Sequence, residues 1–439
     1  MINTLEVKNL NYWRDVIPQT SKRSLDSDLH CDYLIIGGGL SGLSVALHLK
    51  QLQPAAEVAL LEAGMIGEGS SGVNSGICGT RLGPPIEKQI RLYGKKKTAD
   101  IYQYSCDAMN YAASLITSLS FSCNLHSSIQ WQVALTEKDL KLLESRSRLY
   151  QSLGFNISSI SQAELSGLFK TSSGILGGIS FPAFSLNPYY LCLALRNEII
   201  QSGVSVFENT RVFHCPLSST VEYKANGFSV YPKKVVYAVN ASIAQFRMFS
   251  ASVLPIQVFS AVTSSLRTQT ARHAFSNMTD LSLFDARSMF NFIRFLPDSR
   301  ILIGGEYRFS KTEVLEKKTR EMISSRLKRQ LAVFFPGLVS IDFEFQWHGT
   351  VGCTLDDWPI IGPVLPERLW HIGACNGHGV AASLMLGKEV AHSIVNNKHQ
   401  ADYPWQRSAA PSLIHPYVAG LTVPLYLLLL RHRSNLPNT

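Results

Sequence analysis

Three glycines, Gly37, Gly39 and Gly42, have the G-x-G-x-x-G spacing at which a strand turns into a helix against a phosphate group. The first glycine allows the tight turn, the second lets the backbone approach a pyrophosphate, and the third brings helix and strand together. Unpaired N–H groups and the positive end of the helix dipole then face the anion. These residues predict a dinucleotide site, which also includes Leu40 and Ser41.

A carboxylate follows where a ribose would be bound. The apolar run 58–61 ends in Glu62, followed by Ala63, about 20 residues beyond the glycine turn. The alternative is an ordinary strand-helix-strand unit in which the acid merely closes a strand. Because strand, turn, helix and acid occur in this order, we favour the nucleotide site. The motif does not say which dinucleotide binds.

Two further glycine-rich segments could also face a ligand. In the segment 67–77, the short polar side chains of Ser70, Ser71 and Asn74 lie among glycines. We interpret this segment as a loop that wraps a phosphate or a ring edge with backbone N–H groups, and a flexible loop is the alternative. The segment from Gly373 to Val380 opens a helix that we expect to end near residue 395. Two helix N-termini indicate a large bipolar ligand if they meet in space, and otherwise the second is a plain turn.

The composition describes a globular protein with a large interior. The chain has 439 residues, of which 46% are hydrophobic and 17% charged, so we expect two or three folding units. The net charge of +9 comes from dispersed basic residues, and the basic segment 317–329 has the pattern of a helix with a solvated face, which argues against a nucleic-acid partner. The eight cysteines form no C-x-x-C pair, which argues against a metal site and for a reducing compartment. No signal peptide is recognisable, so we expect a cytoplasmic protein.

The fold that must position these residues is of the α/β class. We expect a Rossmann-like domain with a parallel sheet, and a discontinuous substrate domain with an antiparallel sheet formed by the runs 253–264 and 290–305. Tyr12 and Trp13 should anchor an extended lead-in. The expected boundaries are a lead-in at 1–30, a nucleotide domain at 31–95, 186–245 and 345–400, a substrate domain at 96–185 and 246–344, and a tail at 401–439.

The tail contains an apolar run, 417–430, that is interrupted by Pro424 and followed by basic residues. It is shorter than the ~20 residues that a bilayer span needs. A helix docked on the protein and a peripheral membrane contact through 414–433 are both open, and we favour docking.

Taken together, these motifs resemble the D-amino-acid oxidase type of FAD-dependent oxidoreductases. That family includes glycine and sarcosine oxidases, D-amino-acid dehydrogenases and γ-glutamylputrescine oxidoreductase. The resemblance runs from Tyr12 to about Asn396, and the Tyr-Trp lead-in, the Asn-Ser-Gly of the loop and the Gly-His-Gly before the last helix are most similar to the γ-glutamylputrescine oxidoreductase branch.

The resemblance implies that the dinucleotide is FAD. It implies that the glycine turn holds the pyrophosphate, that Glu62 binds the adenosine ribose, and that Val212 meets the adenine through its backbone. The remaining residues that it implies along the ribityl chain and the flavin ring are Ser70, Ser71, Asn74, Ser75, Gly373, His378, Gly379 and Val380.

At two places this chain differs from similar families, and the differences limit which substrate and which mode of flavin binding the resemblance implies. Glycine oxidases place an arginine for the substrate carboxylate where this chain has Val351, and another near Asn376, which makes a small free α-amino acid a poorer substrate. Sarcosine oxidases bind flavin through a cysteine at the position of Gly349, so we expect non-covalent FAD, with Cys353 as the nearby alternative.

The resemblance implies an enzyme that oxidises the C–N bond of an amine or amino-acid derivative by hydride transfer to flavin N5, after which the imine is hydrolysed. We expect His378 to shape the flavin site and Arg294 to anchor an anionic substrate group, although Arg294 could instead face solvent. Oxygen and a quinone both remain open as electron acceptors. The alternative function is a flavoprotein subunit or an RNA-modifying partner.

Overall fold

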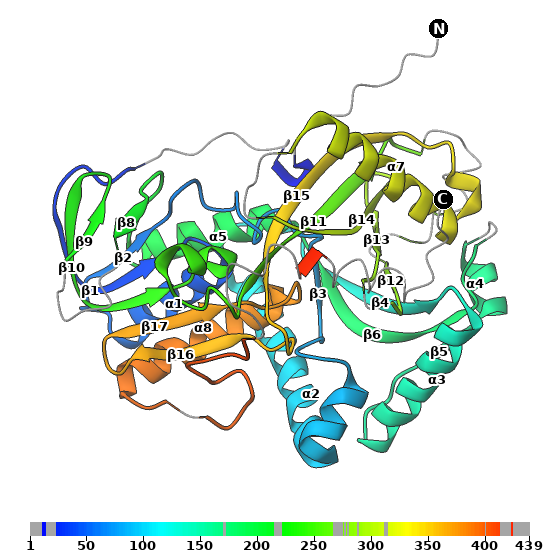
Figure 1. Ribbon diagram of the computed structural model, residues 1–439, viewed down its shortest axis with the longest axis horizontal. Coiled ribbons are helices and arrows are strands. Elements are labelled where there is room, and N and C mark those ends of the chain that lie inside the picture. The colour runs from blue at the N-terminus through cyan, green and yellow to red at the C-terminus, as the bar shows by residue number, and fades with distance from the viewer. Residues whose placement is uncertain are drawn as a thin grey trace, which may run out of the picture.

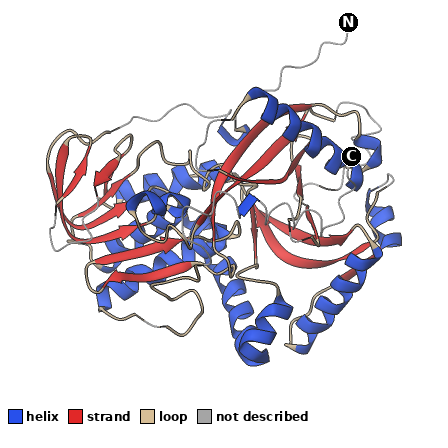
Figure 2. Ribbon diagram, viewed as in Figure 1, coloured by secondary structure: helices blue, strands red, loops and turns tan. Residues whose placement is uncertain are grey.

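The computed structural model describes residues 11–14, 23–169, 173–214, 222–266, 275, 278, 281–287, 289–310, 315–399, 401–412 and 423–424. Figure 1 shows two parts side by side, each built on one sheet, with α2 (Ile86–Ser118) below them. Figure 2 shows helices packed against the sheet at the left and further helices around the sheet at the right. The sequence therefore forms two layered units, as the alternation of its apolar patterns predicts.

The first sheet carries the nucleotide motif. Its strands run in the order β16-β17-β10-β1-β2-β7, with β8 and β9 attached through β10. The pairs β17–β10, β10–β1, β1–β2 and β2–β7 are parallel, and β16 is antiparallel to β17. The strands are β1 (Leu29–Ile36), β2 (Val58–Leu61), β7 (Ser205–Phe207), β8 (Val212–His214), β9 (Tyr223–Ala225), β10 (Phe228–Tyr237), β16 (Ile360–Leu365) and β17 (Leu369–Gly373).

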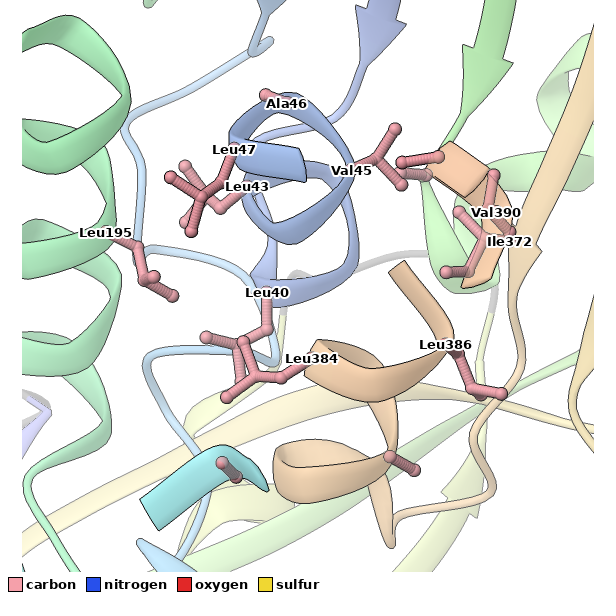
Figure 3. Close-up of a cluster of buried hydrophobic side chains, with 14 of the residues drawn as sticks. Leu40, Leu43, Val45, Ala46, Leu47, Leu195, Ile372, Leu384, Leu386 and Val390 are labelled. Atoms are coloured by element: carbon pink, nitrogen blue, oxygen red, sulfur yellow. The ribbon is translucent and has the colours of Figure 1, made fainter. Parts of the chain in front are cut away.

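Three helices pack together against this sheet: α1 (Leu40–Leu52), α5 (Pro188–Gln201) and α8 (Gly379–Asn396). Figure 3 shows Leu43 and Leu47 of α1 on the side of Leu195 from α5, and Leu384 of α8 close to Leu40. The two helices α1 and α8 approach closely because Gly387 faces Ser44, whose hydroxyl donates to the Leu384 carbonyl at 2.6 Å. The two predicted helices, far apart in sequence, therefore pack together in one core.

The second sheet has the order β15-β11-β14-β13-β12-β4-β6-β3, with β5 paired to β6. All its pairs are antiparallel except β12–β4, and the antiparallel strands expected within 253–264 and 290–305 are confirmed. The strands are β3 (Ile77–Gly79), β4 (His126–Ala134), β5 (Ser159–Ser161), β6 (Gly177–Ser185), β11 (Leu254–Thr263), β12 (Ser282–Asp285), β13 (Phe292–Leu296), β14 (Arg300–Phe309) and β15 (Phe343–Cys353).

The remaining helices lie around these sheets. They are α3 (Glu137–Ser152), α4 (Gln162–Phe169) and α7 (Lys317–Phe334), with short 3-10 helices η1 (Tyr12–Arg14), η2 (Asn240–Phe246) and η3 (Pro336–Leu338). The basic segment expected to be helical is α7, which buries Ile323, Leu327, Leu331 and Phe334 against the second sheet and leaves its charged side outward.

The sheets divide the chain differently from the expected boundaries. β3 and β15 belong to the second sheet, although the expected nucleotide domain included 31–95 and 345–400. Conversely, residues 96–118 of α2 were expected in the substrate domain, but Ile101 to Ile116 of this helix enter the core shared by α1 and α8. A strand that leaves one sheet and a helix that crosses between cores are not visible in local periodicity, because both depend on long-range packing.

Most of the apolar tail lies outside the described residues. Val423 and Pro424 are described, and Val423 is buried against Ile256 of β11. Among the described residues, no helix combines the length and the apolarity needed to cross a bilayer.

Candidate functional site

The glycine turn between β1 and α1 excludes side chains by geometry. A Cβ on Gly42 would lie 2.0 Å from the Gly37 carbonyl oxygen, and Gly37 has a left-handed φ of 109°. A Cβ on Gly39 would lie 2.9 Å from the hydroxyl of Ser71, which accepts a hydrogen bond from the N–H of Leu40 at 2.9 Å. The backbone at the start of α1 is therefore bare and close-packed, as a pyrophosphate site requires.

Glu62 follows β2 and is held by the backbone. Its two carboxylate oxygens accept hydrogen bonds from the N–H groups of Gly38 at 2.7 Å and Gly64 at 2.8 Å. Burial raises the pKa of Glu62, and these two N–H groups oppose the shift. The carboxylate is thus fixed beside the glycine turn, where the remaining lone pairs of its oxygens can accept from ribose hydroxyls.

The loop after Glu62 is held by hydrogen bonds from η1 and from the second sheet. The indole of Trp13 donates to the Asn74 carbonyl, and the indole of Trp347 donates to the Val73 carbonyl, both at 2.7 Å. Asn74 closes the turn itself, because its side chain donates to the Ser71 carbonyl and accepts from the N–H of Gly76. The prediction that Trp13 anchors the lead-in is confirmed, and its partner is this loop.

Arg294 holds the same loop. Its Nη1 donates to the carbonyls of Ser75, Gly76 and Leu186 at 2.9, 3.1 and 2.7 Å, and the side chain is buried. Its guanidinium also lies 5.2 Å from the ring centroid of Trp13. The expectation that Arg294 either anchors the substrate or faces solvent needs correction, because the side chain is buried, its Nη1 donates to three backbone carbonyls, and Arg294 does not line the cavity described next.

A cavity with about 1120 Å³ of empty space lies between the loop, the start of α8 and the second sheet. Of the residues expected at the flavin, Ser70, Asn74, Ser75, His378 and Val380 line it. Opposite them are aromatic and apolar side chains of the second sheet: Ile256, Val258, Phe284, Phe290, Phe292, Tyr307 and Val351. Such a mostly apolar space with a few convergent polar groups is typical of a binding site for a small organic molecule.

His378 lies immediately before α8 and faces an aromatic wall. Its ring stacks on Phe290 with centroids 5.8 Å apart and an interplanar angle of 22°. Burial lowers the pKa of His378 well below the ordinary value, and the charge of Arg81 lowers it further. The imidazole is therefore neutral near pH 7.

The expected site residues fall into two connected groups. The glycine turn, Leu40, Ser41, Glu62 and Ala63 surround the start of α1, while the loop and the start of α8 surround the cavity. Ser71 joins the groups, because it accepts from Leu40 and lies in the loop. Gly373 ends β17 beside Asn240, and Val212 is buried in β8 near the end of β2, outside the cavity.

Sequence reasoning missed two residues. Asn240, at a left-handed φ of 46°, donates to the hydroxyl of Ser70 at 3.2 Å and accepts from the N–H of Ala374 at 3.3 Å, so it ties the loop to the segment before α8. Its place three residues after the end of the parallel strand β10 was the available signal. Arg81, two residues after β3, lines the cavity, and no local pattern distinguished it from other arginines.

These residues fit FAD. The turn provides a cradle that any Cβ would fill, Glu62 is fixed for a ribose, and a continuous loop leads from the start of α1 to a cavity at the start of a second helix. A dinucleotide with a ring at its far end is what such a path accommodates.

Comparison with known proteins agrees with this fit. A family model described as FAD dependent oxidoreductase (DAO) matches residues 32–393. The "Probable oxidoreductase OrdL" of Haemophilus influenzae is 25% identical over 386 residues, 84% of each chain, and gamma-glutamylputrescine oxidoreductase of Escherichia coli is 22% identical over 404 residues, 91% of each chain. The crystal structure of glycine oxidase from Geobacillus kaustophilus has a TM-score of 0.72 at 19% identity, covering 88% of this chain and 100% of that one, and so shows the same fold.

Proposed function

The chain belongs to the FAD-dependent oxidoreductase family, and we propose that it uses FAD to oxidise the C–N bond of a small amine or amino-acid derivative. The observation that carries the proposal is the cavity between the loop, the start of α8 and the second sheet, which is lined on one side by the expected flavin residues and on the other by aromatic side chains. The E. coli relative named as a gamma-glutamylputrescine oxidoreductase supports the choice of a C–N bond.

The residues that would hold the cofactor follow the path already described. The glycine turn would take the pyrophosphate, Glu62 the adenosine ribose, and the backbone of Val212 the adenine. Ser70, Ser71, Asn74 and Ser75 would lie along the ribityl chain and the ring, and Gly373, Gly379 and Val380 would place the N-terminus of α8 against the ring. The positive end of that helix favours negative charge there.

When bound, FAD would supply a two-electron acceptor for the hydride on the oxidised carbon, and the amine nitrogen would lose a proton to solvent. The resulting imine then reacts with water to give a carbonyl compound and an amine. The protein's own part is to position the neutral amine and to exclude water. Phe284, Phe290 and Phe292 provide the apolar wall, and the imidazole of His378 beside them is neutral.

We propose that the FAD is held without a covalent bond. A Cβ on Gly349 would lie 2.7 Å from a methyl carbon of Val73, so a cysteine at this position, where sarcosine oxidases carry theirs, would require Val73 to shift. Burial raises the pKa of the Cys353 thiol to about 12, which disfavours the thiolate needed for attachment.

The experiment is an anaerobic screen of the purified protein. We expect a yellow protein from which acid releases free FAD, and amines that bleach the flavin absorbance. Recovery of the absorbance on admission of air, or only on addition of a quinone, then separates an oxidase from a dehydrogenase. If no amine or amino acid bleaches the flavin, while a partner protein or RNA co-purifies, the proposal is wrong and the chain is a flavoprotein subunit.

A further inference from the structure

The cavity contains one permanent charge among its described lining residues. Arg81 is the only lysine, arginine, aspartate or glutamate of that lining. Within the part of the chain that the structure describes, no hydrogen bond or ion pair is formed by its side chain. A guanidinium has five N–H donors, so this group enters the cavity with its donors available to a ligand.

Arg81 lies two residues after β3 and on the same side as alternate residues of that strand. Ile77, Gly79 and Arg81 are alternate residues and all line the cavity. Gly79 leaves space for Gln130 of the same sheet, because a Cβ there would lie 2.5 Å from the Gln130 amide oxygen. The guanidinium carbon of Arg81 lies 5.5 Å from the ring centroid of Phe290, within the range of a cation–π contact. Phe290 also stacks on His378, so the ring of Phe290 contacts both Arg81 and one of the expected flavin residues.

The charge of Arg81 is only partly balanced by the protein. Burial lowers the pKa of Arg81, and the carboxylate of Asp357 opposes the shift without forming an ion pair with it. Arginine nevertheless stays protonated in proteins. A partly buried cation without a hydrogen-bonded partner is unfavourable, so a ligand anion that reaches it gains both charge attraction and bidentate hydrogen bonds. A second cation in the same cavity is disfavoured for the same reason.

Val351 and Asn376 indicate which part of a substrate Arg81 can bind. Val351 and Asn376 line the same cavity, and they stand where the similar glycine oxidases were expected to carry arginines for a carboxylate next to the reacting carbon. The one cation here enters instead from β3, across the aromatic wall. A carboxylate bound there belongs to a part of the substrate other than the carbon that is oxidised.

We propose that Arg81 binds a carboxylate of the substrate remote from the oxidised C–N bond, so that the substrate class is amines that carry such a carboxylate, and not alkylamines or free diamines. The inference rests on the proposed amine oxidation and adds the identity of the group that selects the substrate. Arg81 acts as a binding residue, and the redox step remains with the cofactor.

The test uses straight-chain primary amines of one length that end in a carboxylate, a carboxamide, a methyl group or a second amine. Flavin reduction is followed anaerobically, and the concentration for half-maximal reduction is compared among the four. For the holoenzyme we expect the carboxylate compound to be preferred over the carboxamide by roughly 10- to 100-fold, as for one charge-assisted pair. Arg81→Gln should bring this ratio close to one, and Arg81→Glu should shift the preference to the diamine.

A second measurement does not need turnover. Glutarate is titrated against the oxidised holoenzyme, and its binding is read from the shift of the flavin absorption bands. Arg81→Gln should weaken it by a similar factor. Arg308→Gln is the matched control, because Arg308 is exposed on β14, outside the cavity lining, and should leave both measurements unchanged. Retained FAD and an unchanged melting temperature exclude misfolding of the variants.

The two proposals fail in distinguishable ways. If amines reduce the flavin but the carboxylate preference is absent, or survives in Arg81→Gln, the assignment of Arg81 is wrong and amine oxidation stands. If glutarate binds through Arg81 while no amine reduces the flavin, the carboxylate site stands and amine oxidation is wrong.

Discussion

The nucleotide turn and the cavity differ in how they are built. The turn, Glu62 and the start of α1 come from one continuous stretch, residues 37–64, whose hydrogen bonds are mostly between its own members. The cavity takes its lining from segments far apart in the sequence: the loop 70–75 with β3, then β4, β11, β12–β14, β15 and the start of α8. A local site is defined by spacing, whereas a composite site is defined by the packing of two sheets.

This difference has an energetic side. In the turn, contacts are made by backbone atoms that cannot move apart without disrupting β1 or α1, so it tolerates no added volume. In the cavity, side chains meet empty space and can be exchanged at smaller cost. Substitutions should therefore affect cofactor content in the first region and ligand preference in the second.

The largest effect is expected for Gly42→Ala. The added Cβ would lie 2.0 Å from the Gly37 carbonyl oxygen, and relief requires α1 to move away from β1. We expect a loss of stability of about 3 kcal/mol or more and roughly tenfold less bound FAD after purification. Absorbance of released flavin per chain measures it. Gly69→Ala is the control, because a Cβ there would meet nothing within 4 Å. Equal FAD content in both variants would contradict the geometry of the turn.

The loop that connects the two regions provides the next test. Arg294→Met removes three hydrogen bonds to the carbonyls of Ser75, Gly76 and Leu186 and leaves these carbonyls without that donor. We expect unfolding free energy in urea to fall by about 3 kcal/mol, with weaker FAD retention. Arg308→Met, on the exposed side of β14, should change neither. If Arg294→Met keeps its stability but loses glutarate binding, Arg294 is a substrate residue after all.

The contrast between Arg294 and Arg81 shows what the sequence could and could not reveal. The glycine turn, Glu62 and the alternating strands were predictable because spacing and period encode local structure. Neither arginine carries a local pattern: one lies on β13 and the other follows β3, and their different roles arise from how the second sheet meets the loop. Asn240 is similar, since its two hydrogen bonds join segments more than 100 residues away. The roles of residues that contact segments distant in sequence can be assigned only from the three-dimensional structure.

Two histidines extend the comparison to pH. Burial lowers the pKa of both His371, in β17 of the first sheet, and His378, at the cavity. His371 is fully buried and its pKa is lowered to about 3, whereas His378 is partly exposed towards the cavity. An unfolded histidine titrates near 6.5. The stability that neutral His371 contributes is therefore present above that pH and is lost as the pH falls below it.

The smallest effect is thus expected for His371→Leu. From pH 6.5 down to pH 5 the free energy of unfolding should fall by about 2 kcal/mol through this one residue, because His371 binds a proton in the unfolded chain but not in the folded one. The variant should lack that part of the decline, whatever its stability at pH 7. Urea midpoints at several pH values measure the slope, and His126→Gln, exposed on β4, is the control. If the slope of stability against pH is the same in His371→Leu as in the unchanged protein, His371 can be protonated in the folded state, which contradicts its burial in the first sheet.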